Sequence, residues 1–187
     1  SPALGDAWLG ALAFTFQLFL DFSAYSEMAI GLGLMLGFQF PDNFNVPYRA
    51  TSIRDFWRRW HMTLSRFLRD YLYIPLGGSR NGFAIYVKAT LITMGLCGLW
   101  HGAGFTFLVW GLLHGAALIV CRVWEDSGRR LAAPVAWALT MLFVMLSWVL
   151  FRAPDFASAG AMLAGMVGFH DLLGATEWPA VLAVAAA

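Results

Sequence analysis

Long apolar tracts constrain this chain more than any other feature of its sequence. Residues 9–40, 83–100, 105–121 and 135–151 each come close to, or exceed, the roughly 20 apolar residues that cross a bilayer as a helix. The chain is 60% hydrophobic and only 12% charged, whereas a soluble domain is about a quarter charged. The sequence therefore predicts an all-α, polytopic membrane protein. We expect residues 1–187 to form a single membrane domain that is a piece of a larger protein.

The first tract is interrupted by Asp21 and Glu27, so it holds either one interrupted span or two packed segments. A carboxylate facing lipid is costly, and we expect both to face the protein interior or an interface. A further short helix is expected over residues 157–169. The cysteines, Cys97 and Cys121, lie in apolar segments without paired or metal-ligand spacing, which predicts buried free thiols.

Residues 51–73 follow a different pattern, in which apolar side chains recur at i, i+3, i+4 and i+7 and arginines fall on the opposite face. Thr51 or Ser52 is expected to cap this helix. An apolar stripe with a basic face predicts an amphipathic helix lying along a membrane interface. Seven arginines between residues 49 and 80 indicate a cytoplasmic surface facing anionic lipids rather than a nucleic-acid site.

His101 stands in the most unusual part of the apolar sequence, among Gly98, Gly102 and Gly104. Glycine at this density weakens a helix, and irregular backbone in a membrane is tolerated only where it is buried in protein or lines a cavity. The pattern predicts a helix break with His101 facing a cavity. A neutral imidazole there is a competent general base, because its unperturbed pKa is roughly 6.5. A packed histidine at a helix kink is an equally good interpretation from the residues alone.

The other histidines carry weaker signals. His61 lies on the interfacial stripe, where amphipathic packing is the more common role. His114 is expected to make hydrogen bonds between helices, and His170 lies in an expected loop. Zinc needs three or four His, Cys, Asp or Glu ligands, and the sequence contains no spacing typical of a metal site. It also lacks a serine-hydrolase elbow and a phosphate-binding glycine loop.

Five stretches of the sequence together resemble a known family. They are residues 43–48 (NFNVPY), 56–65 (FWRRWHMTLS), 67–78 (FLRDYLYIPLGG), 98–103 (GLWHGA) and 110–115 (WGLLHG). In this order they resemble the membrane-bound O-acyltransferase family, and in particular its bacterial branch that contains the alginate O-acetylation protein. The motif region, residues 43–115, resembles the C-terminal part of the family core.

The resemblance implies a helical core with a tunnel through the bilayer and two catalytic histidines. The family's near-invariant histidine corresponds to His101, and its second catalytic position corresponds to His61. His101 is then expected to act as general base, and His61 to position the thioester or stabilise the oxyanion. Six residues are candidates for lining the substrate tunnel, namely Trp60, Trp100, Arg69, Asp70, Trp110 and His114. For the tryptophans, anchoring at the membrane interface is the simpler interpretation.

The implied function is acetyl transfer from a cytoplasmic donor, acetyl-CoA, toward hydroxyls of an extracytoplasmic polysaccharide such as alginate. The transfer is direct or passes through a periplasmic acetyl-relay protein, in a bacterial inner membrane and without a bound cofactor. D-alanyl transfer to teichoic acid by the same fold is an alternative, although residues 73–78 favour the acetylation branch. A transporter or non-catalytic membrane scaffold is another, but its spans should contain more acidic residues than Asp21 and Glu27.

Overall fold

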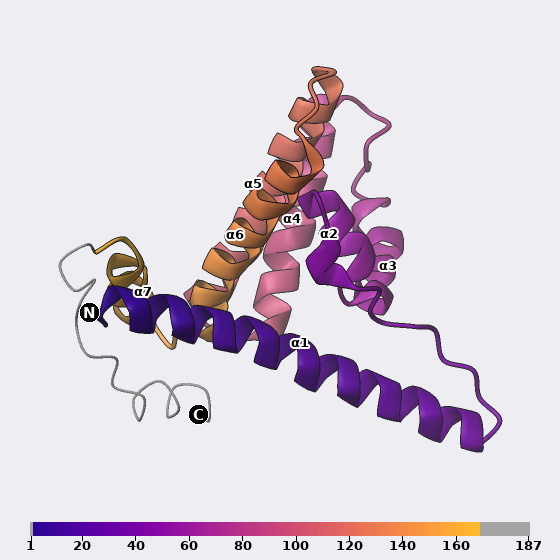
Figure 1. Cartoon of the computed structure of the whole chain (residues 1–187). Coiled ribbons are helices and arrows are strands. Elements are labelled where there is room, and N and C mark those ends of the chain that lie inside the picture. Colours follow the sequence, from indigo (N-terminus) through magenta and orange to yellow (C-terminus); the bar gives the residue numbers. More distant parts are fainter. Residues whose placement is uncertain (1, 169–187) are drawn as a thin grey trace.

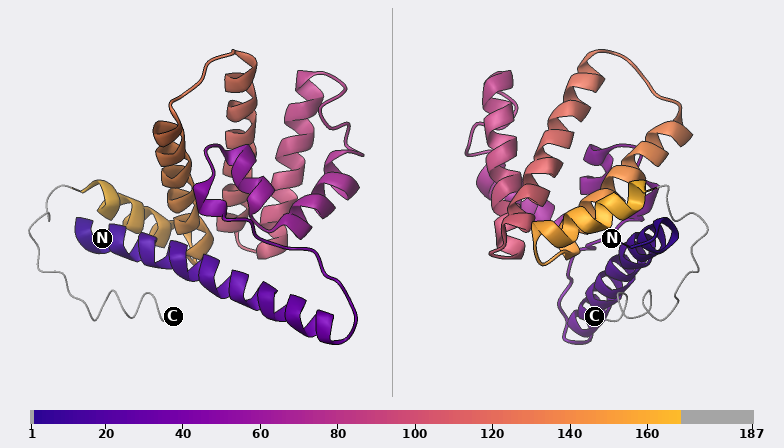
Figure 2. Two further views of the ribbon diagram at one scale, coloured as in Figure 1. Left: turned by 45° about the vertical axis from the view of Figure 1, so that its right-hand side comes forward. Right: turned by 90° about the vertical axis from the view of Figure 1, so that its left-hand side faces the viewer.

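The computed structural model describes residues 2–168, and all regular structure within them is helical. Helices α4 (Phe83–His101), α5 (Phe105–Asp126) and α6 (Ala133–Arg152) stand side by side, and the long helix α1 (Leu4–Met35) crosses them near one end (Figures 1 and 2). These four helices are long and apolar enough to cross a membrane. The predicted spans and the all-α membrane fold are confirmed.

Helix α1 is continuous through the polar interruption, so the first tract forms one helix rather than two packed segments. Asp21 and Glu27 are both exposed on it. The prediction that these carboxylates face the interior is therefore wrong for the part of the protein that the structure describes. Their position at an interface stays a prediction.

Helices α4 and α5 approach so closely that their backbones touch. A Cβ added to Gly98 would lie 3.3 Å from the Cα of Gly111, and one added to Gly111 would lie 3.1 Å from the nitrogen of Gly98. Small residues at such a crossing allow membrane helices to pack backbone to backbone. Gly102 and Gly104 then form the short connection to α5, so the predicted glycine-rich break after His101 is confirmed.

Residues 51–73 do not form the single helix that their periodicity predicts. They form α2 (Ile53–Arg59), α3 (Met62–Leu68) and the π-helix η2 (Arg69–Tyr73). The helix is interrupted at His61, whose φ of +44° lies in the left-handed region that residues other than glycine rarely adopt. The predicted cap is Ser52, whose hydroxyl accepts a hydrogen bond of 3.0 Å from the backbone N–H of Asp55.

The core forms where this break packs against the upright helices. Phe56 and Trp60 are buried together with Trp110 of α5 and Trp148 of α6. The Phe56 and Trp60 rings stack with centroids 5.6 Å apart, and those of Trp110 and Trp148 stack at 5.7 Å. Of the aromatic side chains on the expected stripe, Trp60 is buried and Trp57 half-buried, whereas Phe67 and Tyr71 are exposed. The stripe therefore packs into the protein at the α2 end and not along its whole length.

Helix α7 (Phe156–Val167) supplies the predicted short helix after the last span and packs against the start of α1. The indole N–H of Trp8 donates to the carbonyl oxygen of Met166 at 2.9 Å. Phe169 and His170, on which earlier expectations fall, lie outside the described residues. Cys97 is buried and free, and Cys121 is free and half-buried.

Candidate active site

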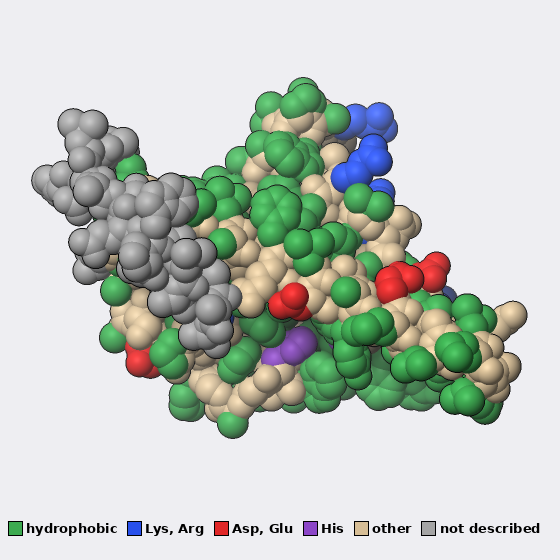
Figure 3. Space-filling view, turned by 60° about the horizontal axis from the view of Figure 1, so that its bottom comes forward, with side chains coloured by type: hydrophobic (Ala, Val, Ile, Leu, Met, Phe, Trp, Pro, Cys, Tyr) green, Lys and Arg blue, Asp and Glu red, His purple; other side chains and the backbone are tan. Residues whose placement is uncertain are grey.

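A cavity of about 200 Å³ lies where the α4–α5 connection meets the α2–α3 break. Its walls come from α1, α4, α5 and α6 and from the α2–α3 break, and they are almost entirely aromatic. The lining residues are Leu18, Phe22, Trp60, His61, Trp100, His101, Trp110, Trp148 and Phe151. The face drawn in Figure 3 shows histidine at the surface in a hollow among apolar side chains, with Lys and Arg gathered elsewhere. Two ionisable side chains therefore share an otherwise apolar chamber.

His101 is the last residue of α4, and aromatic rings surround it on several sides. Its ring centroid lies 5.0 Å from that of Trp100, 5.4 Å from that of Trp110 and 5.2 Å from that of Phe151. Among the described residues, neither ring nitrogen has a hydrogen-bond partner. The rings hold the imidazole by packing and leave both nitrogens available to a molecule in the cavity.

His61 reaches the same cavity from the break between α2 and α3. Its ring packs edge-on against Phe22 at 4.8 Å and lies 6.4 Å from Trp100, which also touches His101. Its Nδ1 atom is 3.1 Å from the side-chain oxygen of Asn43. Burial and, next, the charge of protonated His101 lower the pKa of His61 to about 4, so this ring is neutral at physiological pH.

The structure brings five of the eight expected site residues together on this cavity, namely Trp60, His61, Trp100, His101 and Trp110. It also adds Trp148 and Phe151 of α6, which the sequence did not single out. They lie in a uniformly apolar span, where nothing distinguishes a cavity-lining aromatic from a lipid-facing one. Leu18 and Phe22 of α1 escaped notice for the same reason.

His114 lines neither this cavity nor the larger one described below. It is fully buried beside Trp110, with ring centroids 4.8 Å apart. The indole N–H of Trp57 donates to its Nδ1 at 3.2 Å, and its Nε2 lies 2.9 Å from the hydroxyl of Ser147. Both ring nitrogens are used within the protein, which ties α2, α5 and α6 together behind the cavity wall.

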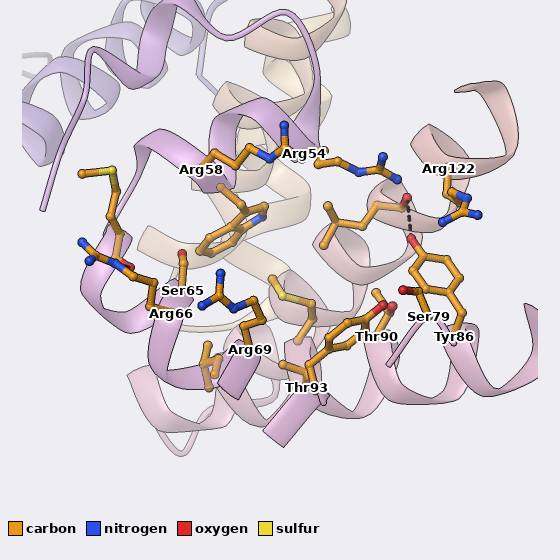
Figure 4. A pocket seen from close by; sticks show the side chains of 16 residues that line it. Arg54, Arg58, Ser65, Arg66, Arg69, Ser79, Tyr86, Thr90, Thr93 and Arg122 are labelled. Atoms are coloured by element: carbon orange, nitrogen blue, oxygen red, sulfur yellow. Dashed lines mark hydrogen bonds between the residues drawn. The ribbon is translucent and has the colours of Figure 1, made fainter. Parts of the chain in front are cut away.

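A second cavity of about 640 Å³ lies on the other side of α2 and α3. Arginines from four elements surround it: Arg54 and Arg58 of α2, Arg66 of α3, Arg69 of η2 and Arg122 of α5 (Figure 4). Of the remaining two expected site residues, Arg69 lines this cavity, whereas Asp70 does not. The two form an exposed ion pair with 2.7 Å between Arg69 Nε and Asp70 Oδ1.

The arginines around the larger cavity differ in their partners. Arg54 pairs with Glu125, and Arg122 with Asp126 at 2.7 Å. Arg66 donates to two backbone carbonyl oxygens. Within residues 2–168, Arg58 and Arg66 have no carboxylate partner, so their charge is available to an anion. Arginine suits this role because its planar guanidinium binds phosphate and carboxylate with two parallel hydrogen bonds.

The α4 wall of the larger cavity carries two unusual hydroxyls. Thr90 and Thr93 are 4% and 6% exposed, and neither hydroxyl has a hydrogen-bond partner among the described residues. A buried polar group without a partner is costly unless a ligand or water satisfies it. With Tyr86, Met94 and Leu118 beside them, these threonines form a narrow wall that is part polar and part apolar. Across the described residues, no three His, Cys, Asp or Glu side chains cluster as a metal site requires.

Comparison with known proteins shows the family of the chain. Residues 6–158 match the model of the family described as MBOAT, membrane-bound O-acyltransferase family. The chain is 52% identical over 91% of its length to the "Probable alginate O-acetylase AlgI" of Pseudomonas putida, and covers 36% of that protein. It is 49% identical over 89% of its length to the "Peptidoglycan O-acetyltransferase" of Helicobacter pylori, and covers 32% of it.

A third relative is more distant. The chain is 30% identical over 76% of its length to the "Teichoic acid D-alanyltransferase" of Bacillus subtilis, and covers 40% of that protein. The chain thus spans about a third of the length of the first two of these curated relatives. The family match includes both histidines of the aromatic cavity and all five arginines of the larger one. The chain belongs to the membrane-bound O-acyltransferase family.

Proposed function

We propose that this chain contains the catalytic histidines of an enzyme that transfers an acetyl group to hydroxyls of an extracytoplasmic bacterial polysaccharide. The observation that carries the proposal is the convergence of His61 and His101 on one small aromatic cavity. An apolar chamber of this kind excludes water, which protects an activated acyl group from hydrolysis and strengthens the electrostatic interactions inside. Its small volume also suits a short acyl group such as acetyl.

In the proposed reaction His101 is the general base. It takes the proton from the attacking hydroxyl while the oxygen forms a bond to the thioester carbonyl carbon. The carbon–sulfur bond then breaks, and the proton passes from His101 to the leaving thiolate. Because both nitrogens of His101 lack partners in the described protein, nothing competes with the substrate for its lone pair. General acid–base catalysis of this kind contributes roughly 10²–10⁴-fold in rate.

The larger cavity supports a donor that carries phosphates, and acetyl-CoA is the donor we propose. Arg58 and Arg66 have the charge to bind its phosphates, while the wall containing Thr90 and Thr93 has hydroxyls for the amides of its pantetheine arm. The cavity lies at the end of the bundle where arginines are dense. Such an excess of basic residues is typical of cytoplasmic loops, which supports a donor that binds from the cytoplasmic side.

The α2–α3 break lies between the two cavities, and its residues line both of them. Trp57 and Met62 line the arginine cavity, whereas Trp60 and His61, only a turn away, line the histidine cavity. In the proposal, the thioester end of the donor crosses this turn to reach His101. The acceptor approaches from the opposite side, as a polysaccharide hydroxyl or as a side-chain hydroxyl of a periplasmic relay protein, while the enzyme itself lies in the bacterial inner membrane.

Substitution of the two histidines in the intact membrane protein tests the catalytic assignment. His101→Ala should remove nearly all acetyl incorporation from acetyl-CoA, and His61→Ala should lower it severely. The double variant should be little worse than His101→Ala alone, since residues that act on the same transition state are strongly non-additive. Activity of His101→Ala within a few-fold of wild type, at equal protein level, would refute the assignment.

The donor is tested separately. The double substitution of Arg58→Gln and Arg66→Gln should raise KM for acetyl-CoA with little change in kcat. In the proposal these arginines bind the donor equally in the ground state and in the transition state, and only that binding is lost. Arg80→Gln is the matched control, since this exposed arginine does not line the cavity. A D-alanyl-loaded carrier protein offered as donor distinguishes the alternative reaction. Transfer of D-alanine in preference to acetyl would overturn the proposed donor and leave the family assignment unchanged.

A further inference from the structure

The α2–α3 break is held by a segment that belongs to neither helix. The backbone N–H of Asn45 donates to the carbonyl oxygen of Arg59, and the N–H of Met62 donates to that of Asn43, both at 2.9 Å. These two bonds bracket Trp60 and His61. They explain how His61 keeps a left-handed backbone that is unfavourable for a residue with a side chain.

The side chain of Asn43 makes a second set of contacts at the same place. Its oxygen lies 3.3 Å from the backbone nitrogen of Thr63, 2.9 Å from the hydroxyl of Thr63 and 3.1 Å from Nδ1 of His61. Its amide nitrogen donates to the hydroxyl of Ser26 on α1 at 3.2 Å. One half-buried amide therefore joins α1, the start of α3 and the histidine of the cavity.

These contacts determine where the proton of His61 resides. A backbone N–H can only donate, so the Asn43 atom facing Thr63 must be the amide oxygen and not the nitrogen. That oxygen can only accept, so Nδ1 of His61 must carry a proton. In the neutral ring, Nε2 is then unprotonated. Asn43 does not line the cavity and His61 does, which leaves Nε2 as the nitrogen available to a substrate.

We propose that Asn43 is a positioning residue that fixes His61 in the Nδ1–H tautomer, so that His61 presents a hydrogen-bond acceptor to the reacting groups. Its role in acetyl transfer rests on the function proposed above, whereas the tautomer itself does not. A neutral His61 in this form has no N–H to offer an oxyanion. Its Nε2 lone pair instead orients a donor in the cavity, such as the attacking hydroxyl or the protonated ring of His101.

His114 provides an internal reference of the opposite kind. Its Nδ1 accepts the indole N–H of Trp57, because that indole nitrogen can only donate. The proton of His114 is therefore on Nε2, from which it donates to Ser147. The structure thus predicts opposite tautomers for two histidines of the same protein.

Magnetic resonance of the intact protein labelled with ¹³C,¹⁵N-histidine tests the tautomers, because only Nε2 is bonded to Cδ2 of the ring. The signals of His61 and His114 are assigned by their loss in His61→Gln and His114→Gln. We expect a proton on Nδ1 of His61 and on Nε2 of His114 in the wild-type protein. A proton on Nε2 of wild-type His61 would overturn the proposal without any need for a variant at Asn43.

Three variants then test the role of Asn43. Asn43→Leu removes the acceptor and should transfer the proton of His61 to Nε2 in part or wholly, with at least a tenfold loss of acetyl transfer. Asn43→Asp keeps the acceptor and should keep the tautomer and restore much of the activity. The assay is run at about pH 8, so that His61 stays neutral beside the added carboxylate. Ser26→Ala is the matched control, since it removes only the partner of the amide nitrogen, and it should leave the tautomer unchanged.

The readouts separate this proposal from the proposed function. An unchanged tautomer in Asn43→Leu overturns the positioning role. A changed tautomer with full activity, while His61→Ala is inactive, shows that the tautomer does not matter and overturns the acceptor role. A changed tautomer with full activity in both Asn43→Leu and His61→Ala overturns the catalytic use of His61 and leaves the positioning of its ring by Asn43 intact.

Discussion

Replacing Gly111 by alanine tests whether the crossing of α4 and α5 fixes the geometry of the candidate active site. The added Cβ would lie 3.0 Å from the carbonyl carbon of Met94 and closer still to its oxygen. Real Cβ atoms essentially never come within 3.0 Å of a heavy atom from another part of the chain. Because the obstacle is helix backbone and not the end of a side chain, rotation about a χ angle cannot relieve it. The two helices must move apart.

Overpacking of this kind costs about 1–3 kcal/mol, and we expect the upper end because both surfaces are backbone. For a chain of 150–250 residues, a loss of about 3 kcal/mol corresponds to a fall in Tm of roughly 6–12 °C. Thermal unfolding of the purified protein in detergent measures this change. Gly160→Ala of α7 is the control, since its Cβ meets nothing within 4 Å, and it should keep or slightly raise Tm.

The same substitution should reduce catalysis beyond its effect on stability. Trp110 precedes Gly111, and His101 follows Gly98 by three residues, so both cavity walls are attached to the crossing. A displacement of about 1 Å in an active site can cost about 10²-fold in rate. Gly98→Ala added to Gly111→Ala should cost little more than either alone, because the first Cβ already separates the helices. Fully additive losses, or a Tm equal to that of Gly160→Ala, would refute this account.

Three further predictions concern other parts of the chain. His114→Asn should lower Tm, because asparagine cannot reach both Trp57 and Ser147 and a buried unsatisfied group costs about 1–3 kcal/mol, while acetyl transfer per folded enzyme stays largely intact. Burial lowers the pKa of His61 from 6.5 to about 4, so the unfolded chain binds more protons between these values. Stability should therefore fall as the pH drops from about 6.5 toward 4, with a smaller slope in His61→Gln. Asp155→Ala, which removes the cap of α7, should cost about 1 kcal/mol in a denaturant titration.

The sequence predicted the features that depend on local chemistry. The spans, the Ser52 cap and the glycine-rich end of α4 follow from apolar length, side-chain capping and the weak helix propensity of glycine. Each depends on residues within a few positions of one another, so no knowledge of packing is needed. The position of His101 at the end of a helix and on a cavity belongs to this group.

The features that the sequence did not predict depend on contacts between distant segments. Nothing in α6 marks Trp148 as part of the cavity, because every residue around it is apolar. The density of arginines predicts a surface facing anionic lipids, but nothing in the sequence indicates that five arginines of α2, α3, η2 and α5 line one cavity. A charge pattern within one helix gives the direction of its polar face but not what lies opposite.

The α2–α3 break is the clearest case in which tertiary contacts override a local pattern. It also explains how an arginine-lined cavity and an aromatic cavity can lie so close together. In an unbroken helix Trp57, Trp60 and His61 would share one face, as their i, i+3 and i+4 spacing predicts. The extended backbone of Trp60 and the left-handed conformation of His61, which Asn43 stabilises, end α2 and send α3 in a new direction. Trp57 then faces the arginine cavity, while Trp60 and His61 face the histidine cavity. A regular helix here would instead place His61 one turn beyond Trp57, on the side of α2 that faces the arginine cavity.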